Sequence, residues 1–186
     1  MKIQQANLIT ELRKLTQDAK VKVASFSDYP LVDLQYKAKE TDWSILECIE
    51  HLNRYGNFYL PEIENSLIQA QPSEQQYFKS GLIGNYFVNM IKADSKKKMK
   101  TTKSMDTTGL DLGLSTIEQF LKQLARLDTL LEQSAKFDLN KVKTAISLTT
   151  LIQLKLGDTL RFVVYHNERH VLQASKIVQS MRSVHV

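Results

Sequence analysis

The stretch STIEQFLKQLARLDTLLEQSA, residues 115–135, decides the fold of this 186-residue chain. Its large apolar side chains recur every three or four residues, which places them on one face of a helix. These residues are Phe120, Leu121, Leu124, Leu127, Leu130 and Leu131. Ser115 and Glu118 have the spacing of a capping box, in which each side chain binds the backbone N–H of the other residue. The stretch therefore predicts a long amphipathic helix with Ser115 as its N-cap.

Three further stretches have the same helical periodicity. The first runs from about Ile3 to Val23. The second runs from Ser44 to about Gln69, and Ser44 with Glu47 forms another capping-box pattern at its start. The last runs from Asp158, the expected N-cap, to about Met181. We therefore expect an all-α fold in which residues 1–186 form a single domain, a four-helix bundle.

The segments between these helices predict the connections of the bundle. A short helix is expected around Asn85 to Lys92, and a long crossover then joins the second and third long helices. The β-branched stretch from Thr144 to Ile152 predicts an extended loop. Six glycines and three prolines are too few turn residues for a β-sandwich or a doubly wound sheet.

The net charge of +5 comes from one short segment. Five lysines lie within eight residues of the crossover, and the remaining charges of the chain sum to zero. These lysines are Lys96, Lys97, Lys98, Lys100 and Lys103. Because nucleic-acid-binding proteins usually present a wider basic face, we expect no nucleic-acid partner.

Further features of the sequence concern location. No stretch reaches eighteen apolar residues, so no membrane span is predicted, and the N-terminus lacks the apolar core of a signal peptide. The single cysteine, Cys48, excludes an internal disulfide and is interpreted as a small core residue. This cysteine usage is compatible with a reducing compartment, and we expect a cytoplasmic protein.

Three histidines are candidate metal ligands. His166 and His170 lie one turn apart on one face of the last helix, so both imidazoles can reach a single ion. The same face carries apolar residues and therefore points into the bundle, where an imidazole needs a hydrogen-bond partner or a metal. His51, at the edge of the apolar face of the second helix, completes the set if the two helices pack together. The alternative is that the pair is structural. Two histidines four residues apart on a helix are, from their spacing alone, more often structural than metal-binding.

Other residues and motifs narrow the chemistry. Glu168 lies on the face opposite His166, which argues against the general base of HExxH enzymes. Glu47, one turn before His51, is either only a cap or a residue that also orients the site. His185 is next to the last residue and is not expected to take part. No Glu-x-x-His motif is present, which disfavours a di-iron centre, and the usual nucleotide-binding and α/β-hydrolase motifs are absent.

In combination, these features resemble the DinB-like (YfiT-like) superfamily of metalloenzymes. The resemblance covers the chain from about residue 8 to residue 181. The matching segments are Trp43-Ser44, Glu50-His51-Leu52, Leu156 to Phe162, His166 to His170 and Gln173-Ala174.

The resemblance implies a bundle of up-down-down-up topology with a long crossover between its second and third helices. It also implies a divalent metal ion, most often nickel or zinc, held by His51, His166 and His170. Characterised members of this superfamily include thiol S-transferases that use bacillithiol, mycothiol or glutathione, a thiol-dependent isomerase and hydrolases. We therefore expect a small-molecule substrate, a low-molecular-weight thiol cosubstrate and a homodimer.

Two kinds of function follow from such a centre. In an enzyme, the metal would ionise a thiol that attacks the substrate, or a water that attacks an ester or amide. The chain has no obvious nucleophile of its own. Four residues lie near the histidines in helical phase or in sequence and are candidates for supporting the ligands or contacting the substrate. These candidates are Tyr55, Tyr165, Arg169 and Gln173. The alternative is a metal-binding stress-response or interaction bundle without catalysis.

Overall fold

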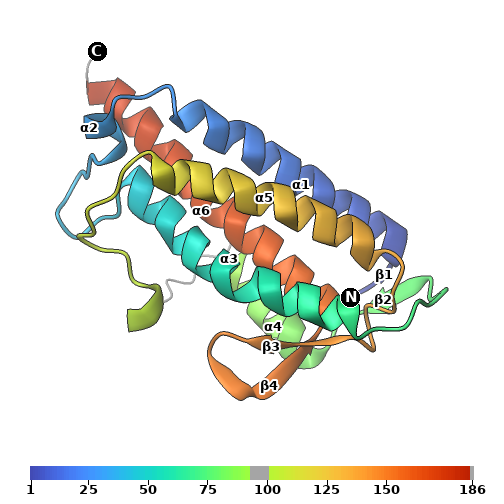
Figure 1. The fold of residues 1–186 in the computed structure, drawn as a ribbon. Helices are drawn as coiled ribbons and strands as arrows, with labels where there is room; N and C mark the ends of the chain where they lie inside the picture. The colour runs from blue at the N-terminus through green and yellow to red at the C-terminus, as the bar shows by residue number, and fades with distance from the viewer. Residues whose placement is uncertain (93–100, 185–186) are drawn as a thin grey trace.

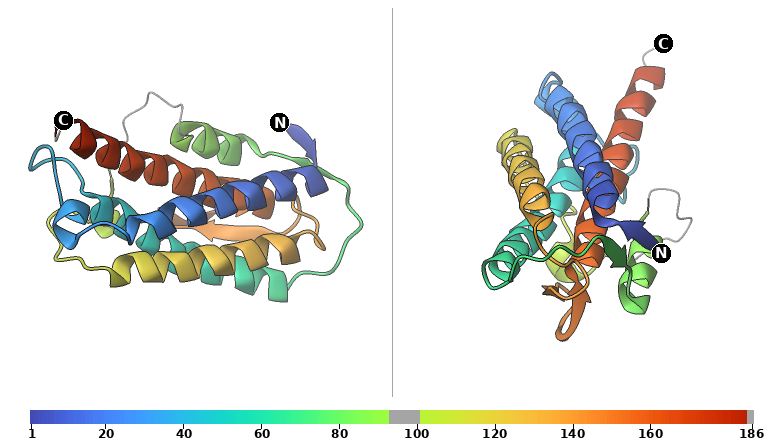
Figure 2. Two further views of the ribbon diagram at one scale, coloured as in Figure 1. Left: turned by 90° about the horizontal axis from the view of Figure 1, so that it is seen from above. Right: turned by 90° about the vertical axis from the view of Figure 1, so that its right-hand side faces the viewer.

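The computed structural model describes residues 1–92 and 101–184. Four long helices lie side by side (Figures 1 and 2). They are α1 (Gln5–Phe26), α3 (Ile45–Ile68), α5 (Ser115–Ser134) and α6 (Leu156–Val184). Helices α1 and α3 each pack against both α5 and α6. The prediction of a mostly helical chain is therefore confirmed.

The shorter elements connect or flank these helices. They are α2 (Leu31–Leu34), α4 (Leu82–Ile91), the 3₁₀ helix η1 (Lys103–Met105), β1 (Lys2–Gln4), β2 (Tyr77–Lys79), β3 (Lys143–Ile146) and β4 (Thr149–Lys155). Helix α4 begins three residues before the short helix that the sequence predicts. Of the lysine run, Lys103 is exposed in η1, and the other four lysines lie outside the described residues. Within residues 1–92 and 101–184, no helix combines the length and the apolar character that crossing a membrane requires.

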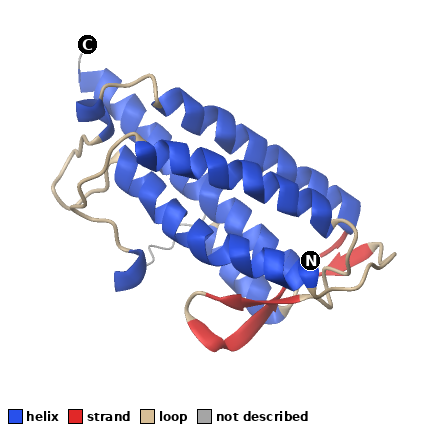
Figure 3. Cartoon of the chain, in the orientation of Figure 1, coloured by secondary structure: helices blue, strands red, loops and turns tan. Residues whose placement is uncertain are grey.

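Two small antiparallel sheets correct the all-α prediction, and Figure 3 shows their strands toward one end of the bundle. In the first sheet Ile3 pairs with Phe78, so Ile3 belongs to a strand and the prediction that it starts a helix is wrong. In the second, β3 and β4 form a hairpin in place of the predicted extended loop. The β-branched residues of this segment favour extended backbone, and a short turn lets the two extended halves pair.

The predicted capping box of α3 is confirmed, and that of α5 is wrong. The Ser44 hydroxyl accepts a hydrogen bond from the Glu47 N–H at 3.2 Å, and the Glu47 carboxylate accepts one from the Ser44 N–H at 2.7 Å. In α5, Ser115 is already the first helical residue, and Leu114 takes the N-cap position without a side-chain bond. Leu114 has helical backbone angles, whereas a capping side chain needs an extended N-cap residue.

Asp158 is not the N-cap of α6, because β4 leads directly into the helix two residues earlier. Its buried carboxylate instead accepts a hydrogen bond at 2.8 Å from the backbone N–H of Gly81, the N-cap of α4. The same carboxylate pairs with Arg161 one turn along α6. The two helices approach so closely that a Cβ atom on Gly84 would lie 2.4 Å from Asp158 Cγ. The first turn of α6 therefore fixes the start of α4.

The interior consists of two apolar clusters at successive positions along α3 and α6. On α6, apolar residues from Leu156 to Tyr165 belong to one cluster, and those from Val171 to Met181 belong to the other. On α3, the division falls between Leu52 and Tyr59. Polar side chains of α3 and α6 near these divisions are therefore placed to form a buried site between the two clusters.

Glu47 ties the crossover to α3. It is 2% exposed, and its carboxylate accepts hydrogen bonds from the Lys37 ammonium at 2.5 Å and from the Gly109 N–H at 2.6 Å. The Thr107 hydroxyl adds a hydrogen bond to the Glu47 carbonyl oxygen at 2.8 Å. The segment after η1 is thus held against the start of α3.

Replacing Glu47 with Gln is expected to lower the free energy of unfolding by about 1–3 kcal/mol, because Lys37 and the Gly109 N–H lose a charged acceptor. Urea denaturation at neutral pH measures this change. The matched control is Glu64→Gln, the same substitution on the same helix at an exposed ion pair with Arg126, and it should change stability by no more than about 0.5 kcal/mol.

The effect of Glu47→Gln should also depend on pH. Burial raises the pKa of Glu47, but hydrogen bonds from Lys37, Ser44 and Gly109 outweigh this effect and bring the pKa below its ordinary value of 4.5. A lowered pKa stabilises the fold above the ordinary value, and this stabilisation is lost as the pH falls through the lowered pKa. The two proteins should therefore converge in stability in acid, and an undiminished difference well below pH 4.5 would contradict this assignment.

Candidate metal centre

Three histidines from two helices meet at the boundary between the apolar clusters. Helix α3 carries His51, and α6 carries His166 and His170 one turn apart. One ring nitrogen from each histidine lies within 4.8 Å of the others. The Nε2 atoms of His51 and His166 are 3.3 Å apart. The packing of α3 against α6 therefore brings together the three histidines that the sequence predicts as ligands.

Burial keeps these imidazoles neutral. His51 is 3% exposed, His166 is 5% exposed and His170 is partly exposed. Loss of hydration, reinforced by the neighbouring histidines, lowers the pKa of His166 well below 6.5. Loss of hydration also lowers the pKa of His51, and together with the neighbouring His51 it lowers that of His170 to about 3. Because imidazole binds a metal ion only in its neutral form, all three rings are ready to act as ligands at neutral pH.

Hydrogen bonds to oxygen atoms set the orientation of two of the rings. His51 Nδ1 lies 2.7 Å from the carbonyl oxygen of Met105, and His170 Nδ1 lies 2.9 Å from the amide oxygen of Gln173. An oxygen of this kind only accepts, so each Nδ1 carries the proton and each Nε2 keeps its lone pair. Metal-binding histidines commonly have such a partner on the second nitrogen, which fixes the tautomer.

The donor set fits a divalent metal ion. With the Nδ1 proton of His51 given to Met105, its Nε2 lone pair faces the Nε2 atom of His166 at 3.3 Å. This contact is a hydrogen bond when His166 Nε2 carries its proton, and it can become a metal site when the proton of His166 lies on Nδ1 and both Nε2 atoms present lone pairs. Neutral imidazole nitrogens are ligands that zinc and nickel both accept.

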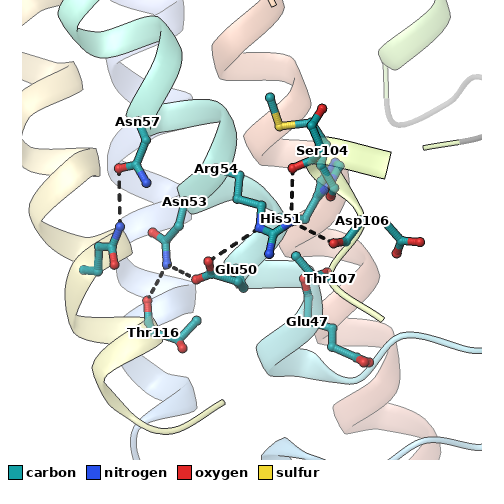
Figure 4. A network of polar contacts seen from close by, with 12 residues as sticks. Glu47, Glu50, His51, Asn53, Arg54, Asn57, Ser104, Asp106, Thr107 and Thr116 are labelled. Carbon is teal, nitrogen blue, oxygen red and sulfur yellow. Dashed lines mark hydrogen bonds and ion pairs between the residues drawn. The ribbon is translucent and has the colours of Figure 1, made fainter. Parts of the chain in front are cut away.

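The crossover supplies part of this arrangement, as Figure 4 shows. The Arg54 guanidinium, one turn after His51 on α3, donates to the carbonyl oxygens of Ser104 and Asp106 at 3.0 and 2.8 Å. These two bonds hold the chain on both sides of Met105, whose carbonyl then faces His51. Sequence reasoning missed Met105, and no signal could have revealed it, because any residue type offers the same backbone carbonyl.

Aromatic side chains surround the histidines. The Trp43 ring centroid lies 4.8 Å from that of His51, and the Tyr55 centroid lies 4.3 Å from that of His166. Phe162, one turn before His166, stacks on it at 5.6 Å with 13° between the planes. Trp43 and Phe162 are quoted in the sequence resemblance without a role, and the structure shows that both contact the histidines.

Two hollows meet at the histidines. The first, the polar groove, has a volume of about 660 Å³, is open to solvent and is lined in part by Trp43, Gln173 and Lys176. The second, the aromatic pocket, has a volume of about 120 Å³ and includes all three histidines in its lining. Arg169 and His170 line both hollows. A molecule in either hollow therefore reaches the same centre from a different side.

The remaining sequence candidates divide into two groups. Tyr55, Arg169 and Gln173 lie at the centre or its hollows, as described above. Tyr165 does not point there, because its hydroxyl donates to a carboxylate oxygen of Glu11 on α1 at 2.7 Å. Cys48 is fully buried in one apolar cluster, where loss of hydration raises the pKa of its thiol, and this agrees with its interpretation as a core residue.

Comparison with known proteins identifies the family. No curated protein and no solved structure gives a significant match to this chain. A family model does match residues 15–174, a span that includes all three histidines, and its description is the DinB superfamily. This match extends over most of the chain, and the protein therefore belongs to the DinB superfamily.

Proposed function

We propose that this protein is a metal-dependent enzyme in which His51, His166 and His170 hold one divalent ion, nickel or zinc. The observation that carries the proposal is that ring nitrogens of three neutral imidazoles lie within 4.8 Å of one another where two hollows meet. The reaction that we propose is the transfer of a low-molecular-weight thiol, of the bacillithiol, mycothiol or glutathione type, to a small-molecule substrate.

Catalysis is favoured over a purely structural metal by the number of ligands. Among the residues that the structure describes, the cluster contains three histidines and no additional cysteine, aspartate or glutamate. Structural zinc sites are almost always closed by four protein ligands, whereas catalytic sites keep a position for water or substrate. The two hollows supply access to such a position. These features support the enzyme over a non-catalytic metal-binding bundle.

The polar groove favours a thiol as one of the reactants. A divalent ion held by the histidines would lower the pKa of a thiol or a water beside it. Arg169 and Lys176 place two positive charges on a groove of about 660 Å³, which is within the size range of small-ligand sites. Peptide-like thiols carry carboxylates that these cations can bind, and Asp42 offers a partner for an ammonium group. Hydrolysis of an ester or amide at the same centre is the second candidate.

The proposal includes the up-down-down-up order of the four long helices. Gln5, at the start of α1, accepts a hydrogen bond from the Leu139 N–H just beyond the end of α5, which supports opposite directions for α1 and α5. Asn53, in the first half of α3, donates to the Thr116 carbonyl at the start of α5, which supports the same direction for α3 and α5. We further propose a cytoplasmic homodimer without a nucleic-acid partner, as the sequence predicts.

Metal binding can be followed through Trp43, the single tryptophan of the chain, whose ring lies 4.8 Å from that of His51. Titrating chelator-treated protein with Ni²⁺ or Zn²⁺ should change the tryptophan fluorescence and saturate at one ion per chain. His51→Ala and His166→Ala should each weaken binding by at least about 10-fold, because a lost ligand should cost no less than a lost outer-shell partner.

The control for this titration is His185→Ala, which changes a histidine at the C-terminus. Elemental analysis of freshly purified protein gives an independent measure of bound metal, and circular dichroism checks that each variant is folded. If a folded variant lacking all three histidines binds the ion as tightly as the original protein, the metal assignment is wrong.

Thiol transfer can be tested with glutathione, bacillithiol and mycothiol against a chlorinated aromatic electrophile. Lys176→Ala should raise KM for a carboxylate-bearing thiol about two- to fivefold with little change in kcat, because one partly screened ion pair is lost. The change should vanish with 2-mercaptoethanol, which has no carboxylate. Lys122→Ala on α5 is the matched control, and an equal rise in KM with both variants would exclude a specific contact.

A further inference from the structure

The aromatic pocket lies between the histidines and the β3–β4 hairpin. Helix α3 supplies Tyr55 and Tyr59 to its wall, and α6 supplies Phe162. The opposite side comes from α4 and the hairpin. The apolar residues on that side are Phe87, Ile91, Ile146, Leu148 and Leu154. Thr101 and Thr102 of the crossover complete the lining. Five segments thus contribute to one largely apolar hollow that ends at the candidate metal centre.

The rings of this wall are arranged to receive a flat apolar molecule. Tyr55 and Tyr59 are nearly parallel, with 14° between their planes and 6.1 Å between centroids. Phe162 lies 5.5 Å from Tyr59 and continues the ring surface toward His166. An aromatic ligand can stack or pack edge-on against such rings, while the aliphatic side chains opposite contact its other face.

The charges around the pocket favour an uncharged ligand. Among the described lining residues, Arg169 is the only one with a formal charge at neutral pH. Its guanidinium donates to the carbonyl oxygens of Met90 and Lys92, and it also lines the polar groove, where the proposed function assigns it to a carboxylate of the thiol. An anion or cation entering the pocket would lose hydration against aromatic and aliphatic walls, which is costly without a dedicated partner.

Besides the histidines and Arg169, the polar lining residues are Tyr55, Tyr59, Ser147, Thr101 and Thr102. The Tyr59 hydroxyl accepts a hydrogen bond from the Ser147 N–H at 3.3 Å, which fastens the hairpin to α3. The Tyr55 hydroxyl has no partner among the described residues, and burial raises the pKa of Tyr55 to about 12, so this hydroxyl stays protonated. It is therefore available to donate to an oxygen or a leaving group of a ligand that lies beside His166.

The volume limits the ligand to about the size of one ring. The pocket measures about 120 Å³. For comparison, an apolar protein cavity of about 150 Å³ binds benzene. We therefore expect one aromatic ring to fit best, with its reactive substituent toward the histidines, and a fused two-ring system to bind more weakly.

We infer that the aromatic pocket binds the electrophilic reactant, an uncharged organic molecule whose apolar part is about the size of one benzene ring. This inference rests on the proposed function, in which the hydrophilic thiol occupies the polar groove. In the transfer, a bond forms between the thiol sulfur and a carbon of the electrophile while the bond to the leaving group breaks. The leaving group departs with its electron pair, and the proton of the thiol is released to water.

The first experiment measures binding without chemistry. Toluene, benzoate and naphthalene are titrated by ligand-observed NMR into the protein as purified and into the protein after chelator treatment. We expect toluene to bind in both cases, and benzoate and naphthalene to bind at least tenfold more weakly. Because this readout needs neither metal nor thiol, it can succeed where the proposed function fails, and it can fail where that function holds.

Variants locate the bound ring. Ile146→Phe fills the pocket from the hairpin and should weaken toluene binding at least tenfold. Leu151→Phe makes a matched change on the same hairpin at a side chain that is 92% exposed and should leave binding unchanged. Phe87→Ala removes a wall and should improve naphthalene binding relative to toluene, which keeps the test decisive if Ile146→Phe does not fold.

A kinetic comparison connects the pocket to the reaction. With benzyl chloride as electrophile, Ile146→Phe should raise KM for benzyl chloride and leave KM for the thiol unchanged. The inference is overturned if toluene does not bind, or if folded Ile146→Phe and Phe87→Ala proteins bind toluene and naphthalene as the original protein does. Equal binding of benzoate and toluene by the chelator-treated protein would also overturn it, because the walls would then not select against charge.

Discussion

Burial of three uncharged imidazoles between two apolar clusters is the constraint on which the rest of this structure depends. Each ring has lost most of its water, and the Nε2 atoms of His51 and His166 face one another at 3.3 Å. A buried polar group of this kind is costly unless it has a partner. The structure supplies carbonyl partners on the outward nitrogens of His51 and His170. The inward nitrogens either share a proton or bind a cation in its place.

The crossover between α3 and α5 contributes to this centre because it is tied down at several points. Glu47 holds the Gly109 N–H, and Arg54 holds the carbonyls of Ser104 and Asp106. The Met105 carbonyl between them is thereby kept in line with His51. Charged residues of α3 thus act on the site indirectly, since they order a loop that would otherwise be free to move away from the histidine.

The sequence predicts the helices well, and it predicts that His166 and His170 share one helix face, because both depend on patterns that repeat with the helical turn. Phe120 and Leu124 mark the buried face of α5, and His166 and His170 mark one face of α6 in the same way. The capping box at Ser44 forms as its local spacing predicts. These features are local, so one sequence is enough to detect them.

The features that the sequence does not reveal are set by contacts between distant segments. The same local spacing fails at Ser115, because the chain enters α5 already in helical conformation. Asp158 has the right residue type for an N-cap, but its carboxylate caps α4 rather than its own helix. Pairing of Ile3 with Phe78, and of β3 with β4, depends on tertiary arrangement. The aromatic pocket is missed for the same reason, since its walls come from five segments.

The bond between Asp158 and the start of α4 joins two walls of the pocket through one helix, because α6 also carries His166 and Phe162. The hairpin is joined to α3 through Tyr59 to Ser147 and through Glu62 to the Ala145 N–H. It is joined to α6 through the Thr144 and Thr159 hydroxyls and through the direct passage from β4 into the helix. The walls that would select a molecule are therefore built on the same framework as the histidines that would act on it.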